Sequence, residues 1–106
     1  MNDFETISYD QAVNLVRRHA NAEITLVTPS VPGVSLQLSG RLYVQDGAEH
    51  FAFAVAASEQ LSASVLLFPH CLFQIPESEG EVNALVCAMP GPEDEGDALL
   101  WMLRFE

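Results

Sequence analysis

The sequence contains no lysine, and its only permanent positive charges are four arginines. Fifteen aspartate and glutamate residues oppose them, which gives a net charge of −11 at pH 7. Nucleic-acid binding depends on lysine and arginine side chains that neutralise phosphates, so this composition argues against DNA or RNA as a partner. An acidic surface suits a cationic protein partner, although a biased genome or a salt-adapted host would leave the same composition.

Cysteine is also scarce, and no long apolar run is present. Cys71 and Cys87 stand in apolar surroundings without the spacing of metal ligands, which favours buried thiols in a reducing, cytoplasmic compartment. The sequence leaves a disulfide between them open. The acidic N-terminal segment lacks the apolar core of a signal peptide, and no apolar stretch is long enough to cross a bilayer. We therefore expect a cytoplasmic protein without a membrane partner.

Catalytic and metal-binding motifs are missing as well. The histidines are His19, His50 and His70, and the adjacent His70 and Cys71 would point to opposite faces of a strand. The glycines are isolated and form no phosphate-binding loop. The sequence therefore predicts no cofactor, no metal site and no enzymatic activity.

The apolar fraction, in contrast, is large. It reaches 49% of 106 residues, which is enough for a single domain over residues 1–106 with its own core. The stretch Val34–Val44 alternates apolar residues or glycine with mostly polar residues, and a period of two predicts a half-buried strand. Asp46-Gly47 predicts a turn, and His50–Ala56 predicts a second strand with large apolar side chains on one face and alanines on the other.

One helix precedes these strands. Ser8 and Gln11 have the spacing of a capping box, and apolar residues recur every three or four positions, which predicts a helix over about residues 8–20. Residues 1–7 are expected to be a lead-in, and residues 29–33 and 58–62 to be loops. Further strands are predicted at Glu23–Thr28, Val65–Phe68, Cys71–Ile75, Val82–Met89 and Ala98–Phe105. A helix is the alternative for the last of these.

The predicted fold is α+β and mostly β. We expect the N-terminal helix to be followed by a small, strongly bent antiparallel barrel of the SH3/Sm type, with a C-terminal β extension. A split sheet with the helix on one face is the alternative architecture.

Two short motifs resemble the signatures of the Sm/Hfq-like small β-barrels. In the first signature a glycine allows the second strand to bend and an aspartate follows six residues on, as Gly40 and Asp46 do here. Residues 67–76 resemble the second signature in its bacterial, Hfq-type form, with loose matches at Phe68, His70 and Pro76. The resemblance covers about residues 8–76, and it implies the barrel fold and a ring-forming habit.

The residues with which that family binds RNA are not retained. His50 stands where the family has a polar RNA-reading residue, and Pro69 replaces the basic residue before His70. The resemblance therefore implies a fold and an assembly habit without RNA binding. Residues 77–106 lie outside it and are expected to form an added hairpin.

Two interaction surfaces are predicted from the patterning. Several strands are apolar on both faces, and one helix with a narrow apolar stripe cannot cover the second face, which predicts a homo-oligomer. Its contact is expected at Leu100, Trp101 and Met102, with a core position as the alternative for Trp101. Two acidic loops form a candidate surface for a basic protein partner, comprising Glu77, Glu79, Glu81, Glu93, Asp94, Glu95 and Asp97.

The predicted function is that of a non-enzymatic protein-interaction or assembly module. One alternative is an acidic regulator that mimics nucleic-acid charge and blocks a basic partner. Another is an Sm-like RNA-binding barrel, which rests on family analogy alone. A small hydrolase or a metal enzyme ranks last.

Overall fold

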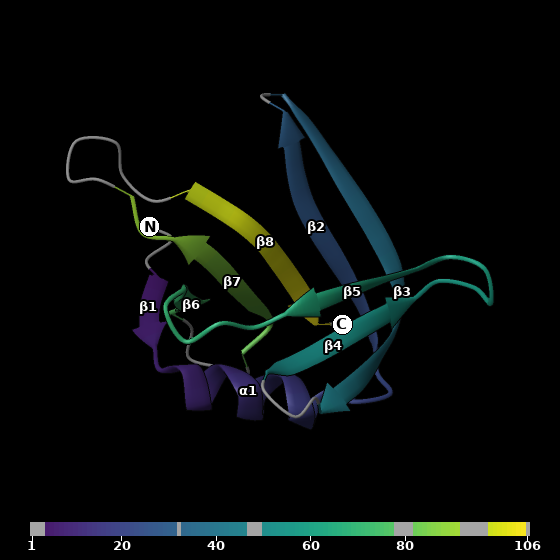
Figure 1. Cartoon of the computed structure of the whole chain (residues 1–106), viewed down its shortest axis with the longest axis horizontal. Helices are drawn as coiled ribbons and strands as arrows, with labels where there is room; N and C mark the ends of the chain where they lie inside the picture. The colour runs from purple at the N-terminus through teal and green to yellow at the C-terminus, as the bar shows by residue number, and fades with distance from the viewer. Residues whose placement is uncertain (1–3, 32, 47–49, 78–81, 92–97, 106) are drawn as a thin grey trace.

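One helix and eight strands make up the described chain, which covers residues 4–31, 33–46, 50–77, 82–91 and 98–105 of this computed structural model (Figure 1). The mostly-β class predicted from the sequence is confirmed. In chain order the elements are β1 (Phe4–Ile7), α1 (Tyr9–Arg18), β2 (Glu23–Val31), β3 (Val34–Asp46), β4 (Phe51–Ala56), β5 (Ser62–Leu66), β6 (Leu72–Pro76), β7 (Ala84–Met89) and β8 (Ala98–Phe105).

All eight strands belong to a single antiparallel sheet. Its spatial order is β1-β6-β7-β8-β2-β3-β4-β5, so β1 and β5 are its two ends. No ladder joins these two strands within the described ranges. The sheet is therefore open there, and a finer likeness to an SH3/Sm-type barrel stays a prediction.

The C-terminal strands β7 and β8 pair with each other as the expected hairpin, but this hairpin lies inside the sheet and is not an addition to it. β7 pairs with β6 on one side and with β8 on the other, and β8 continues the sheet into β2. The reason is burial, because Leu85 of β7 and Leu103 of β8 are both fully buried. Ala98–Phe105 is a strand, as predicted over the helical alternative.

The helix begins where the sequence predicts. The Ser8 side chain accepts from the backbone N–H of Gln11 at 3.1 Å, and the Ser8 N–H donates to the Gln11 side chain at 2.9 Å. This reciprocal pair is the capping box, which satisfies two N–H groups that no helical carbonyl can reach. The buried face of α1 consists of Ala12, Leu15 and Val16.

α1 lies across one end of the curved sheet (Figure 1). At its first turn the Tyr9 ring lies 6.1 Å from the Phe73 ring of β6. At its last turn the Arg17 guanidinium lies 5.0 Å above the Phe51 ring of β4, and beyond it His19 stacks on Phe105 of β8 at 3.8 Å. The helix therefore ties together strands from both halves of the sheet.

Three strands, β1, β2 and β5, differ most from the predicted ones. β1 occupies the expected lead-in, because its residues pair with β6 as an edge strand. β2 runs past Pro29, which still lies opposite Ser35 before a register shift. β5 begins at Ser62 because the turn before it is tight: Ala57 N–H donates to the Leu61 carbonyl at 3.0 Å.

Candidate functional site

The hairpin of β2 and β3 extends beyond the strands that flank it. β8 pairs with β2 only up to the Val27–Met102 pair, and β4 pairs with β3 only from Arg41 onward. Outside these ladders lie residues 28–31 of β2 and 34–40 of β3. We call this part of the hairpin the arm. Figure 1 shows it rising from the sheet at the end opposite α1.

The arm carries exposed apolar side chains. Leu36 is 63% exposed, the largest fraction among the large apolar side chains described, and Val34 is 50% exposed. Across from the arm, Leu61, which directly precedes β5, is 56% exposed. Leu36 and Leu61 belong to a groove of about 310 Å³, which is lined by Leu26, Thr28, Leu36, Gln37, Leu38, Leu61, Ser62 and Ala63.

Gly40 marks the base of the arm. A Cβ at this position would overlap the carbonyl group of Ala56 and would lie 2.8 Å from the backbone nitrogen of Ala57. The end of β4 therefore approaches the backbone of β3 so closely that only glycine fits at this position. The sequence predicts a bend of the strand at Gly40, whereas the structure gives close backbone approach as the reason for a glycine there.

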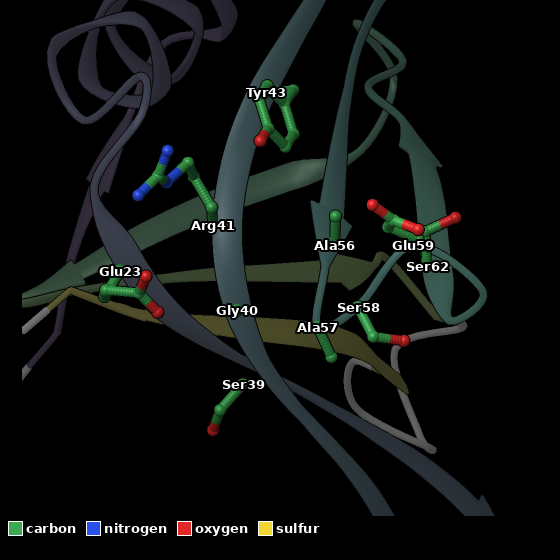
Figure 2. Close-up of a pocket in the computed structure, with 10 residues that line it drawn as sticks. All are labelled: Glu23, Ser39, Gly40, Arg41, Tyr43, Ala56, Ala57, Ser58, Glu59 and Ser62. Atoms are coloured by element: carbon green, nitrogen blue, oxygen red, sulfur yellow. The ribbon is translucent and has the colours of Figure 1, made fainter.

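A second, more polar crevice of about 530 Å³ lies on the other side of Gly40. Figure 2 shows Glu23 and Arg41 on one side of β3 and Ser58, Glu59 and Ser62 on the other. Glu23 lies opposite Arg41 in the β2–β3 ladder. Because a carboxylate stands beside this arginine, the crevice offers little net positive charge to an anionic ligand.

The three predicted contact residues of β8 have different environments. Trp101 is only 5% exposed and packs edge-on against Phe53 at 5.4 Å, so it is a core residue in this fold. Leu100 is 38% exposed and Met102 is half-buried. β8 is also an inner strand, which leaves Leu100 and Met102 as surface positions and removes Trp101 from the exposed candidates.

Of the predicted acidic partner surface, the structure describes Glu77 alone, which is exposed. The other six carboxylates, Glu79, Glu81, Glu93, Asp94, Glu95 and Asp97, lie outside the described residues. The acidic surface stays a prediction.

The histidines are held by aromatic packing. His50 lies edge-on to Phe68 at 5.1 Å, and His70 lies 5.5 Å from the same ring. His19 bonds through Nδ1 to the Leu15 carbonyl oxygen at 3.0 Å. Within the described ranges, no group of three or more histidine, cysteine, aspartate or glutamate side chains is placed to hold a metal ion.

Cys71, just before β6, and Cys87 of β7 are free thiols whose side chains lie within hydrogen-bond reach of each other. Burial raises the pKa of the Cys87 thiol from 9.0 to about 12, and the neighbouring Cys71 adds to the effect through its charge and a hydrogen bond. Cys87 therefore stays protonated in the folded protein at neutral pH, which suits a core thiol and not a nucleophile.

This pKa predicts a loss of stability in alkali. Below pH 9 the Cys87 thiol is protonated in both states, whereas between pH 9 and about 12 only the unfolded chain releases the proton. We expect the free energy of unfolding to fall by about 1.4 kcal/mol per pH unit in this window. Urea unfolding from pH 8 to 10.5 measures it. Cys87→Ala should flatten this dependence and Cys71→Ala should largely keep it; equal slopes in all three proteins would contradict the assignment.

No helix in the described part of the chain combines the length and apolarity that crossing a membrane requires. Comparison of the chain with protein-family models, with curated proteins and with solved structures finds no match.

Proposed function

We propose that the protein is a non-enzymatic protein-interaction or assembly module, and that the arm and its groove form the contact surface. The observation that carries this proposal is the gathering of exposed Leu36 and Leu61 around one apolar groove. Clustered apolar surface on a soluble domain is typical of interaction sites. The residues that line the groove are uncharged and mostly apolar, which suits a protein segment better than a charged metabolite.

The charge pattern supports the same surface. No residue from Ile24 to Gly40 is charged, although the chain as a whole carries a net charge of −11. Glu23 and Arg41 flank this stretch on the two strands. A charge-free arm on a strongly acidic protein reduces the cost of desolvation when the arm is covered by a partner.

We also propose that the protein self-associates and works in the cytoplasm, on a fold related to the small SH3/Sm-type barrels. The free thiols of Cys71 and Cys87 support a reducing compartment. The strong curvature of the sheet, with α1 across one end, supports the fold relation (Figure 1).

Leu36→Asp tests the contact surface. The wild-type chain and the variant are each immobilised, and the protein retained from a cell extract, including further copies of the chain, is identified and quantified. We expect the variant to retain at least about ten-fold less, because a buried carboxylate without a partner costs more than 1.4 kcal/mol. Leu66→Asp is the matched control, since Leu66 is 51% exposed on β5 and does not line the groove.

Two outcomes would contradict the proposal. One is equal retention by the wild-type chain and Leu36→Asp, when circular dichroism shows both to be folded. The other is submicromolar binding of oligo-uridine or duplex DNA at physiological salt, which the shortage of cationic side chains predicts to be absent.

A further inference from the structure

The outer edge of β3 within the arm has backbone groups that face no neighbouring strand among the described residues. Leu42 donates to the Ala22 carbonyl at 3.0 Å and accepts from the Asn21 N–H at 2.7 Å, so the even-numbered residues of β3 direct their backbone groups toward β2. Backbone groups alternate along a strand, and the odd-numbered ones therefore point away from β2. β4 pairs with them from Arg41 on. Before it, the open edge consists of Ser35, Gln37 and Ser39.

This edge also lacks the usual protection against strand pairing. Edge strands in soluble proteins commonly carry charges, prolines or bulges that block another chain. Along the arm, Pro29 and the register shift lie on β2, and no residue of β3 before Arg41 is charged. The two end strands of the sheet are closer to charge, because β1 contains Glu5 and β5 follows Glu59.

The arm is a two-stranded segment with exposed leucine and valine. A hairpin of two strands is marginally stable in water unless another strand or a packed face supports it. Leu36 and Val34 have no such cover over at least half of their surface. Adding a third strand to β3 would complete the arm and would place side chains of the added strand beside Leu36.

A second copy of the chain fits this edge better than a cationic partner does. A basic segment would be attracted to the acidic surface, whereas the arm is the charge-free part of the hairpin. Two copies that each carry −11 repel each other, so their contact must avoid acidic residues. Antiparallel pairing of one edge with itself is also what a two-fold axis produces.

We propose that two copies of the chain pair the open edges of β3 in antiparallel orientation, with the two-fold axis beside Leu36. This inference rests on the proposed function. The open stretch runs from Gly33 at the tip to Ser39, because the end of β4 occupies the edge at Gly40. Leu36 is its midpoint. In this register Ser35 of each copy lies opposite Gln37 of the other, and the two Leu36 side chains meet.

A cysteine placed at the axis tests the register. The Leu36 residues of the two copies would lie opposite each other as a non-hydrogen-bonded pair, with Cα atoms about 4.5 Å apart. This separation permits a disulfide between cysteines at position 36. In a Cys71→Ser background, Leu36→Cys is expected to form a covalent dimer on mild oxidation at least ten times faster than Ser35→Cys. The two Ser35 residues are offset along the strands, beyond disulfide reach.

The mass of the unmodified chain is the second measurement. Light scattering over a concentration series is expected to show a rise from 11.6 kDa to twice that mass, with stronger association at raised salt. Equal cross-linking of the two cysteine variants would overturn the register. Association that is lost in Leu100→Asp but kept in Leu36→Asp would overturn the site. A constant mass of 11.6 kDa, together with retention of another protein that depends on the arm, would show that the edge binds that protein and not a second copy. The proposed function would then still stand.

Discussion

Gly40→Val is expected to unfold the protein or to lower its melting temperature by at least about 10 °C. The added Cβ would overlap the Ala56 carbonyl group, which belongs to the β3–β4 ladder, and would press on the Ala57 nitrogen, whose N–H donates to the Leu61 carbonyl in the next turn. Backbone cannot move aside as a flexible side chain can. Overpacking a core costs about 1–3 kcal/mol when side chains adjust, and we expect the upper end or more here.

Gly40→Ala separates the two explanations for this glycine. If the position only needs flexibility to bend, alanine should cost about 0.5–1 kcal/mol or less. If close backbone approach is the reason, alanine already carries the offending Cβ and should cost nearly as much as valine. Gln37→Val is the matched control on the same strand, since Gln37 is exposed. An unchanged melting curve for Gly40→Val would contradict the close approach of the end of β4 to Gly40.

The local elements were predictable because their signals are local. The Ser8–Gln11 capping box fixed the start of α1, and the period-two pattern of Val34–Val44 identified β3. Both signals arise from residues within one turn or one strand. The mostly-β class followed from the same evidence.

The sheet order was not predictable, because it depends on which strands meet. Val82–Met89 and Ala98–Phe105 were recognised as strands, but nothing in their pattern shows that they lie between β6 and β2. A strand buried inside the sheet and a strand of an added apolar hairpin have the same apolar composition, so composition does not distinguish them. β1 was missed for the opposite reason: Phe4–Ile7 is mostly exposed, and its strand conformation comes from pairing with β6.

The candidate site was also hidden in the sequence. In the sequence, Leu36 is one more apolar position of an alternating strand. Its exposure follows because β4 ends at Ala56 and does not extend along the arm. The available signal was the absence of charge from Ile24 to Gly40. In an acidic chain, a long stretch without charged residues indicates a surface that a partner covers, because a charged side chain there would be costly to bury.

Trp101→Ala is expected to lower the free energy of unfolding by about 3–5 kcal/mol, because it removes a large aromatic side chain from the core. Trp101 is 5% exposed, and its ring packs edge-on against Phe53, which is fully buried. Because Trp101 is the single tryptophan, unfolding must be followed by far-ultraviolet circular dichroism in urea and not by its fluorescence. Trp101→Phe, which keeps a ring against Phe53, should recover a large part of the loss.

Leu100→Ala distinguishes a core position from a contact between copies. Leu100 precedes Trp101 on the same strand but is 38% exposed, so its truncation should cost less than about 1 kcal/mol. If Trp101 instead formed the subunit contact, Trp101→Ala would reduce the mass measured by light scattering and leave the unfolding of the monomer nearly unchanged. The packing of Trp101 on Phe53 predicts the opposite, a destabilised chain whose remaining folded fraction still associates through the arm.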